Sequence, residues 1–319
     1  MAIGGYFELE LQRKKEYYKN AIRLNTGRNA FEYILRARGY TKVYLPYYTC
    51  DVMLEPINKL NLQYEFYSID STFNPLFDFS LIKENDAFVY TNYFGICDRQ
   101  VKEVAKKCKN LIIDNSQAFY SKPLPGIDIF YSARKFFGVP DGAYLFIDKK
   151  LEEDIEQDYS YDRCEHLLGR VDIDAESFYS SFKKNEKKLI NQPIKTMSNL
   201  TMHLLQSINY EEVAKTRMKN FFFLDEILRD KNTLEFEIEK NAVPMIYPFL
   251  IENGVEIKKR LIENKIFVAT YWPNISEWCS TNSFEYYLMQ NLLPLPMDQR
   301  YDENELNIIN KHLKGIYNE

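Results

Sequence analysis

The chain has 319 residues, of which 45% are hydrophobic and 27% are charged, so its composition is that of a globular protein too long for one small core. Its net charge of −5 gives no basic surface for nucleic acid or an anionic membrane. Five widely spaced cysteines without a CxxC pair indicate neither a metal site nor a disulfide framework. With no N-terminal signal and no run of transmembrane length, we expect a cytoplasmic protein.

Apolar runs and helical patterns alternate in the first half of the chain. Residues 1–7 are expected to form an extended arm, and residues 8–22 a charged surface helix. The predicted strands are 43–45, 63–67, 88–90, 111–113, 127–131 and 143–147, and helices are predicted at 51–60 and 101–107. This alternation predicts an α/β fold with a mainly parallel sheet and helices on both faces.

A further helix is predicted to begin near residue 26, after a polar segment that contains Gly27. Free N–H groups and the helix dipole make such a start a natural anion site. An ordinary N-cap that binds nothing has the same sequence.

The pattern changes after residue 147. Residues 149–190 are charge-rich and helical in character, and residues 183–188 are expected to form a solvated face. Helices are predicted at 197–207, 210–228, 255–263 and 302–316, strands at 243–250 and 267–271, and a short apolar segment at 292–296. We therefore divide the chain into a large α/β domain, residues 1–207 with the arm, and a small C-terminal α/β domain, residues 208–319.

Two reactive side chains follow buried strands in the middle of the chain. Asp114 ends the strand at 111–113, and Lys135 comes shortly after the strand at 127–131. Open α/β sheets bind their ligands at strand ends. Pyridoxal phosphate (PLP) needs an acid that keeps its pyridine nitrogen protonated and a lysine that forms a Schiff base. The same pattern fits an ordinary βαβ protein whose aspartate caps a helix and whose lysine is solvated.

Read in order, several short segments resemble the DegT/DnrJ/StrS family of sugar aminotransferases, which have the type I fold of PLP enzymes. The resemblance covers nearly the whole chain, and it depends on the order and spacing of the segments. These segments are Thr26-Gly27-Arg28-Asn29-Ala30, Val43-Tyr44-Leu45-Pro46, Tyr93-Phe94-Gly95, Asp114-Asn115-Ser116-Gln117-Ala118, the Lys135 segment, Met197-Ser198-Asn199 and residues 292–296.

The resemblance assigns roles to individual residues. Lys135 matches the lysine that holds PLP and then moves the proton at the substrate carbon. Asp114 matches the partner of the pyridine nitrogen. Thr26 and Gly27 match the start of the phosphate-binding helix, and Gln117 matches a residue near the 3′ oxygen of the cofactor.

Some positions depart from the family pattern. Cys50 stands where the family has an aromatic residue on the cofactor ring, so either its thiol packs there or Tyr47 or Tyr48 takes that place. Ser132 lies closer to the lysine than the family's serine, and it is either a phosphate ligand or simply the end of a strand. Arg28 replaces a small residue and is either a phosphate contact or a surface side chain.

The family also implies a homodimer with active sites at the subunit interface. Its asparagine that reaches the partner's phosphate is missing here, so either Lys195 replaces it or the contact is lost. Tyr93 and Tyr271 are candidates for the substrate side, and packing explains both equally well.

The function that the resemblance implies is a PLP-dependent aminotransferase acting on a nucleotide-linked keto-sugar. The implied amino donor is glutamate, and the implied pathway is surface polysaccharide or amino-sugar biosynthesis. Another reaction on the same cofactor stays open, because the cofactor carries the chemistry. So does a non-catalytic relative that binds PLP or a sugar as a regulatory or assembly protein. The joint presence of Lys135, Asp114 and the phosphate-binding helix favours the enzyme.

Overall fold

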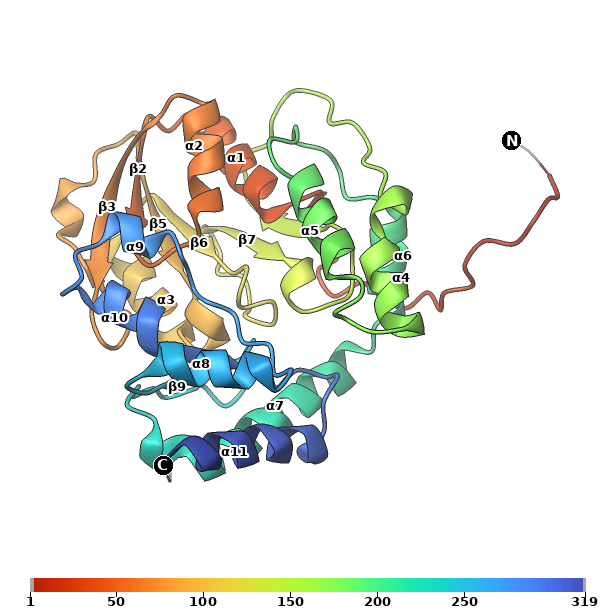
Figure 1. The fold of residues 1–319 in the computed structure, drawn as a ribbon. Helices are drawn as coiled ribbons and strands as arrows, with labels where there is room; N and C mark the ends of the chain where they lie inside the picture. The colour runs from red at the N-terminus through yellow and green to blue at the C-terminus, as the bar shows by residue number, and fades with distance from the viewer. Residues whose placement is uncertain (1–2, 318–319) are drawn as a thin grey trace.

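A large sheet lies at the centre of the computed structural model, which describes residues 3–317 (Figure 1). Its strands are β1 (Ile22–Leu24), β2 (Lys42–Pro46), β3 (Gln63–Ile69), β4 (Pro75–Leu76), β5 (Asp86–Thr91), β6 (Leu111–Asp114), β7 (Asp128–Ser132) and β8 (Ala143–Phe146). These eight strands follow the order β1-β8-β7-β6-β5-β2-β3-β4 across the sheet. Each strand predicted in the first half of the chain is present, whereas β1 and β4 were not predicted.

The middle of the sheet is parallel. Strands β3, β2, β5, β6 and β7 run in one direction, and β8, β1 and β4 at the margins are antiparallel to their neighbours. Parallel neighbours need long crossover connections, which is why helices separate these strands along the chain. The carboxyl ends of β5, β6 and β7 consequently share one edge, where Asp114 is in register with Thr91 and Phe130.

Helices cover the sheet and build most of the C-terminal part. The α-helices are α1 (Gly27–Arg38), α2 (Leu54–Lys59), α3 (Asp98–Lys107), α4 (Glu165–Asp172), α5 (Tyr179–Lys188), α6 (Asn199–Ser207), α7 (Tyr210–Leu228), α8 (Gly254–Glu263), α9 (Ile275–Trp278), α10 (Phe284–Asn291) and α11 (Glu303–Tyr317). The 3₁₀ turns are η1 (Asp51–Met53), η2 (Phe79–Leu81), η3 (Tyr93–Gly95), η4 (Ala133–Lys135), η5 (Tyr161–Arg163) and η6 (Arg229–Lys231). Along residues 3–317, none of the helices has the length and apolarity needed to cross a membrane.

Alternate side chains of the buried strands enter two separate cores. In β2, Val43 and Leu45 join the core that lies against α1 and α2, whereas Tyr44 between them joins the core that contains residues of α3 and α10. Successive side chains of a strand point to opposite faces of a sheet. Because both faces are covered, the strands are apolar throughout, which is the pattern that made them visible in the sequence.

The C-terminal part has a small sheet of its own. Strands β9 (Tyr247–Leu250) and β10 (Leu292–Leu295) pair in antiparallel fashion, and residues of α7, α8 and α11 close a third core with them (Figure 1). These strands lie within the predicted strand 243–250 and the apolar segment 292–296. The smaller C-terminal α/β part is thus present, and its exact boundary at residue 208 stays a prediction.

Two predicted features are wrong, and a third is correct only in part. Residues 8–22 form no helix: they are irregular up to β1, and in residues 14–19 only Glu16 and Tyr18 turn inward, two positions apart as in a strand. Residues 267–271 form no strand, because no strand of the small sheet pairs with them. The face at 183–188 is not wholly solvated, because Asn185 is buried and donates to the carbonyl of Pro140 at 3.1 Å.

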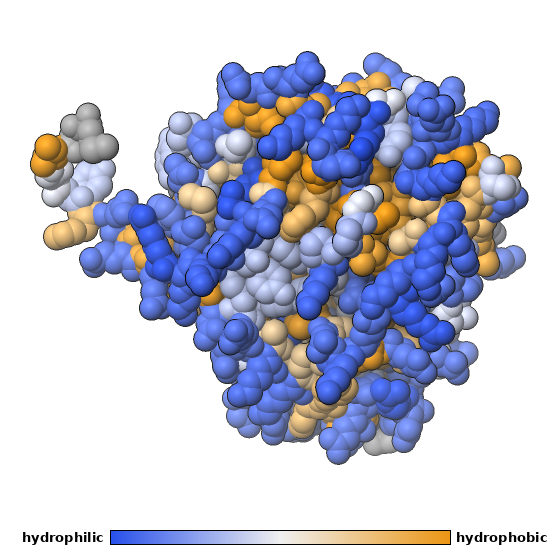
Figure 2. All heavy atoms as spheres, turned by 180° about the vertical axis from the view of Figure 1, so that it is seen from behind, coloured by the Kyte–Doolittle hydropathy of each residue, from blue (hydrophilic) through white to orange (hydrophobic). Residues whose placement is uncertain are grey.

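The arm predicted at residues 1–7 is described from residue 3 onward. It stands clear of the body in two opposite views (Figures 1 and 2) and continues to residue 12.

Candidate active site

The acid and the lysine singled out in the sequence lie at one edge of the main sheet. Asp114 is the last residue of β6 and is in register with Phe130 of β7. From β7 the chain continues through Ser132 into η4, which ends at Lys135. Since β6 and β7 are parallel neighbours, both side chains come from the edge where open α/β sheets bind ligands.

The carboxylate of Asp114 is buried without a counter-charge in contact. Its Oδ1 accepts a hydrogen bond from the N–H of Ser116 at 2.8 Å, and no cationic nitrogen of residues 3–317 forms an ion pair with it. Burial raises the pKa of Asp114, while the hydrogen bonds from Ser116 and the charge of Lys135 oppose that rise. A cationic ligand would offset the cost of burying this carboxylate.

The start of α1 faces the ends of β6 and β7. A Cβ atom on Gly27 would lie 3.4 Å from Ser116 Oγ and 3.8 Å from Ser132 Cβ, so glycine keeps the helix start clear beside both serines. Within the described chain, no acceptor is bonded to the backbone N–H of Gly27 or Arg28. These N–H groups, the helix dipole and the two hydroxyls form an anion cradle, the name we use for the backbone of residues 27–28 with Ser116 and Ser132.

The hydroxyl of Thr26 is already engaged in capping α1. It accepts a hydrogen bond from the N–H of Asn29 at 3.1 Å and donates to Asn29 Oδ1 at 2.6 Å. Its side chain therefore has the N-cap arrangement that the sequence left open. Ser116 was not singled out as a ligand, and its position two residues after a strand-ending aspartate was the available signal.

Lys135 is exposed and has no hydrogen-bond or ion-pair partner in the described part of the chain. Its charge acts on the pKa of Asp114, of Cys50 and of Glu186. Burial alone would raise the pKa of Glu186. The charges of Arg134 and Lys135 outweigh burial, so the net shift of this pKa is downward. A free amine beside a buried carboxylate is available for covalent and proton-transfer chemistry.

Cys50, rather than a tyrosine, interacts electrostatically with Lys135. Burial raises the pKa of the Cys50 thiol to about 11, and the charge of Lys135 opposes this rise. The ring of Tyr47 stacks on Phe66, with centroids 5.0 Å apart. Tyr48 is fully buried, and the described residues offer its hydroxyl no hydrogen-bond partner. Cys50, Tyr47 and Tyr48 are the candidates for the residue that packs on the cofactor ring. Of these, Cys50 is the one whose pKa is affected by the charge of Lys135.

The remaining predicted residues differ in how they are held. Gln117 Oε1 accepts a hydrogen bond from the N–H of Phe94 at 2.9 Å. Tyr93 is fully buried, and its hydroxyl donates to the carbonyl of Tyr48 at 3.0 Å, so it packs in the core. Tyr271 is half-buried and stacks on Phe94 with centroids 5.8 Å apart, and burial raises its pKa to about 12.

The backbone of Arg28 belongs to the anion cradle, but its side chain forms an ion pair with a neighbouring helix. Its Nη1 is 2.6 Å from Glu55 Oε2 of α2, and Glu55 Oε1 accepts a hydrogen bond from the N–H of Asn191 at 2.8 Å. Its charge also helps to lower the pKa of Glu186. Its contact partner in this structure is thus a carboxylate.

The turn that carries Lys135 is held at its next residue by two side chains of the C-terminal part. The carbonyl of Phe136 accepts hydrogen bonds from Gln299 Nε2 at 2.7 Å and from Arg217 Nη2 at 3.4 Å. The guanidinium of Arg217 also lies over the ring of Phe136, 4.6 Å from its centroid. Neither Arg217 nor Gln299 was singled out in the sequence.

A second buried cluster holds the loop that follows Lys135, at Asp141. The carboxylate of Asp141 is 2.8 Å from Arg163 Nη2, which also lies 2.7 Å from Asp158. The hydroxyls of Ser198 and Thr201 donate to the same carboxylate. The side chain of Asp141 is fully buried, and this residue was not singled out in the sequence.

The groups at this edge fit PLP. Asp114 offers a buried carboxylate to a pyridinium nitrogen, the anion cradle offers donors to a phosphate, and Lys135 offers a free amine to an aldehyde. Among residues 3–317 there is no group of three or more His, Cys, Asp or Glu side chains that could hold a metal ion.

Comparison with known proteins reveals similarity of structure but not of sequence. No protein-family model and no curated protein matches the sequence. The structure is similar to a DegT DnrJ EryC1 StrS aminotransferase from Brucella abortus, with 15% identity, 94% of this chain and 86% of that chain covered, and a TM-score of 0.63. It is also similar to the sugar aminotransferase CalS13 from Micromonospora echinospora, with 15% identity, 92% and 87% covered, and a TM-score of 0.61.

A third solved structure, NtdA from Bacillus subtilis with bound cofactor PMP, has 13% identity, 94% and 73% covered, and a TM-score of 0.64. These comparisons confirm the predicted type I fold, with a mainly parallel sheet and a smaller C-terminal part. At such low identities the similarity establishes the fold alone.

Proposed function

We propose that this protein is a PLP-dependent aminotransferase that acts on a sugar with a keto group. The observation that carries the proposal is the presence of Asp114, Lys135 and the anion cradle at one edge of a type I fold. The three suit the nitrogen, the aldehyde carbon and the phosphate of one PLP molecule. Solved proteins of this fold bear the names of sugar aminotransferases, and one of them holds PMP, which supports the cofactor and the reaction class.

The reacting centre consists of Asp114 and Lys135. PLP, when bound, supplies the electron sink that lets an amino group pass from an amine donor to a keto acceptor. Asp114 keeps the proton on the pyridine nitrogen, because that cation offsets the burial of the carboxylate. The free amine of Lys135 would hold the cofactor through its aldehyde group and would then serve as the base that moves the proton at the substrate carbon.

The other residues of the site bind and orient. The N–H groups of residues 27–28 and the hydroxyls of Ser116 and Ser132 hold the phosphate, with the dipole of α1 behind them. Gln117, fixed through its Oε1, would offer its amide nitrogen to the 3′ oxygen of the cofactor. Cys50 would pack against the ring in place of an aromatic side chain.

The finer assignments follow from the sequence resemblance. The acceptor is a nucleotide-linked keto-sugar and the donor is glutamate, in cytoplasmic synthesis of an amino sugar or a surface polysaccharide. The active unit is a homodimer with its sites at the subunit interface.

Absorbance spectroscopy of the full-length protein, loaded with PLP and then desalted, tests the cofactor and the lysine. We expect a visible band in the wild type and in Lys150→Ala, which changes an exposed lysine elsewhere, and no such band in Lys135→Ala. Glutamate should bleach the band, and a keto-sugar nucleotide should restore it.

The two possible negative results of this experiment refute different parts of the proposal. A wild-type protein without the band would refute PLP binding. A band that no amino donor bleaches would refute the aminotransferase and favour a PLP-binding regulatory or assembly protein.

A further inference from the structure

The anion cradle consists of N–H groups and hydroxyls and includes no cationic side chain. A helix start offers the equivalent of about half a positive charge, whereas a phosphate monoester carries about −1.5 to −2 charges at neutral pH. The cradle by itself therefore leaves most of the charge of a bound phosphate unbalanced. Two arginines can supply the missing charge: Arg28, whose backbone belongs to the cradle, and Arg134, which follows Ser132 by two residues.

The side chain of Arg28 is held in a braced and largely buried ion pair. Its Nη1 lies 2.6 Å from Glu55 Oε2, and the two side chains are 11% and 17% exposed. The other carboxylate oxygen of Glu55 accepts a hydrogen bond from the N–H of Asn191 at 2.8 Å. Release of Arg28 would leave this carboxylate largely buried without its counter-charge, which is unfavourable.

Arg134 belongs to a looser pair. Its Nη2 donates to Glu186 Oε1 of α5, and among residues 3–317 Arg134 is the one hydrogen-bond partner of that carboxylate. The side chain of Glu186 is 38% exposed, so water can hydrate its carboxylate when the pair opens. The Nε of Arg134 is buried, and no acceptor in the described part of the chain bonds to it. The guanidinium therefore has a hydrogen-bond donor that this pair leaves unused.

The carboxylate of Glu186 lies where the positive charges of the site converge. Burial alone would raise its pKa, but the charges of Arg134, Lys135 and Arg28 lower it. One of these three residues bears the amine of the site, and another supplies an N–H group of the cradle. An anion in the cradle and the carboxylate of Glu186 consequently compete for the same cations.

We propose that Arg134 is an anion-binding residue of the site, and that Glu186 holds its guanidinium until a phosphate enters the anion cradle. The inference deepens the proposed function, on which it rests for the identity of the phosphate as that of the cofactor. Phosphate carries more charge than a carboxylate and accepts bidentate hydrogen bonds from a guanidinium, so the exchange of partners favours the phosphate. Only side-chain rotations of Arg134 are required, because η4 already joins this residue to Ser132.

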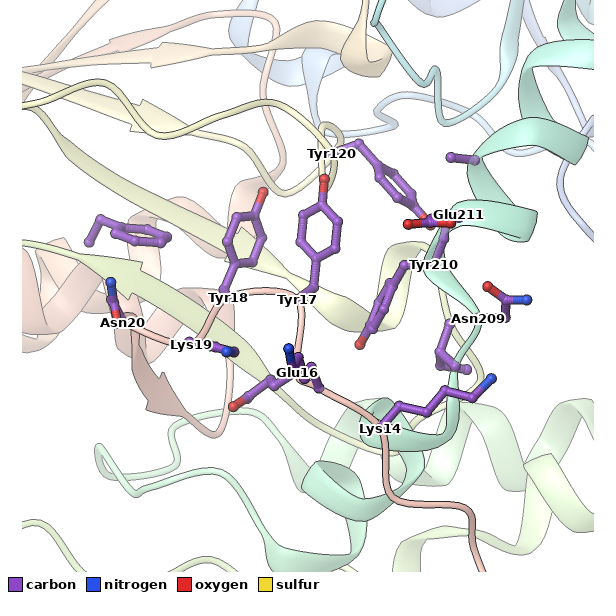
Figure 3. A pocket seen from close by; sticks show the side chains of 14 residues that line it. Lys14, Glu16, Tyr17, Tyr18, Lys19, Asn20, Tyr120, Asn209, Tyr210 and Glu211 are labelled. Atoms are coloured by element: carbon purple, nitrogen blue, oxygen red, sulfur yellow. The ribbon is translucent and has the colours of Figure 1, made fainter.

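A second group of cations lies at the base of the arm, around a cavity of about 750 Å³ (Figure 3). Lys14, Lys15 and Lys19 contribute to its lining. Glu211 lines the same cavity from the first turn of α7, where a carboxylate offsets the helix dipole and repels another anion. We therefore place the phosphate at the cradle, and these lysines serve as a control.

Isothermal titration calorimetry of the full-length protein without cofactor, with inorganic phosphate at constant ionic strength, measures the contribution of Arg134. Arg134→Gln should weaken phosphate binding about tenfold. Glu186→Gln should strengthen it about two- to fivefold, because a competing half-exposed ion pair is lost. A gain in affinity cannot come from a misfolded variant, so the second change remains decisive if the first destabilises the turn. Absence of the loss or of the gain would overturn the proposal.

The double variant Arg134→Gln with Glu186→Gln separates release of the arginine from loss of a repelling charge. If Glu186 acts by holding Arg134, its replacement should change phosphate affinity less than about twofold in the Arg134→Gln background. An equal gain in both backgrounds would show repulsion alone and would contradict the exchange of partners. Glu153→Gln is the matched control, because Glu153 pairs with Arg36 at 2.7 Å near the opposite end of α1 from the cradle, and it should leave the affinity unchanged.

Two further comparisons locate the anion. Lys14→Gln with Lys19→Gln should leave phosphate affinity unchanged, and a loss as large as that of Arg134→Gln would place the phosphate in the cavity of Figure 3 and overturn the proposal. In absorbance titrations, Arg134→Gln should weaken binding of PLP about tenfold and leave binding of pyridoxal, which lacks the phosphate, unchanged. Equal losses for PLP and pyridoxal would refute the assignment to the cofactor's phosphate.

Failure of the proposed function has a different signature from failure of this inference. A protein that binds inorganic phosphate through Arg134 but forms no visible band with PLP would refute PLP binding and leave Arg134 as an anion-binding residue. A protein that forms the band but binds PLP and inorganic phosphate equally well with and without Arg134 would refute the inference alone.

Discussion

The fully buried guanidinium of Arg217 offers a quantitative test of how the C-terminal part is joined to the lysine turn. Its Nε donates to Gln299 Oε1 at 2.8 Å and its Nη1 to the carbonyl of Met245 at 3.0 Å. No carboxylate of the described residues forms an ion pair with it, and burial lowers its pKa from 12.5 to about 10. We consider the replacement Arg217→Met, which keeps an unbranched apolar stem and removes the guanidinium with its charge.

Two opposing effects determine the magnitude. The lowered pKa corresponds to about 3 kcal/mol of unfavourable burial, at about 1.4 kcal/mol per pKa unit, and the substitution recovers this. Two charged hydrogen bonds contribute about 1.5–3 kcal/mol each, and the contact with the ring of Phe136 contributes about 2 kcal/mol when desolvated. The loss exceeds the gain, so Arg217→Met should lower the free energy of unfolding by about 2–5 kcal/mol.

Urea unfolding followed by circular dichroism measures this difference. Arg229→Met is the matched control, because Arg229 stands just after the same helix with an exposed side chain paired to Asp225. Asp225 is buried, but the guanidinium of Arg229 is exposed and screened by solvent, so we expect its loss to cost less than about 1 kcal/mol. If Arg217→Met costs no more than Arg229→Met, the hydrogen bonds and ring contact of Arg217 do not outweigh its burial, and the reasoning fails.

Further predictions concern the acid of the site and the loop behind it. Asp114→Asn should weaken PLP binding at least about tenfold in an absorbance titration, because a neutral amide cannot hold the pyridinium proton; unchanged affinity would contradict the assigned role. Gly142→Ala should destabilise the protein by about 1–3 kcal/mol in urea unfolding, since φ is +110° and the new Cβ would lie 2.9 Å from a threonine methyl group of α6. Gly126→Ala, at φ +75° in open space, should cost less, about 1–2 kcal/mol. Burial raises the pKa of Asp141 from 3.8 to about 6, so its stabilising contribution is complete below about pH 4 and is lost as the pH rises through 6. Relative to Asp141→Asn, the wild type should lose up to about 3 kcal/mol of unfolding free energy between about pH 4 and pH 7; a difference that stays constant with pH would show that Asp141 ionises as it does in the unfolded chain.

The strands of the main sheet could be predicted because burial of both faces makes them apolar throughout. The helix expected at residues 8–22 illustrates the opposite case. Its charges have helical spacing, but the segment is fixed by a distant contact, in which the hydroxyl of Tyr18 donates to the carbonyls of Phe119 at 2.5 Å and Ser121 at 2.9 Å. Tertiary contacts of this kind override local periodicity and leave no trace in it.

The candidate site was predictable to the extent that its residues follow recognisable elements. Asp114 and Lys135 come after apolar strands, and Gly27 opens a helix. Arg217 and Asp141 escaped notice because their partners are far along the chain: Arg217 bonds to a carbonyl 81 residues away, and Asp141 accepts a bond from a hydroxyl 60 residues away. Local sequence patterns hold no information on such pairs.

The two attachments of the loop after Lys135 determine how this loop takes part in local opening of the molecule. The loop is fixed at Phe136 by side chains from α7 and from the segment after β10, and at Asp141 by α6 and the segment before it. A local opening that detaches α7 and the segment after β10 therefore also frees the loop at Phe136, next to Lys135, and this end of the loop exchanges with solvent together with them. The sheet edge that bears Asp114 lies outside these attachments. During such an opening the lysine would lose its position while the acid keeps its own.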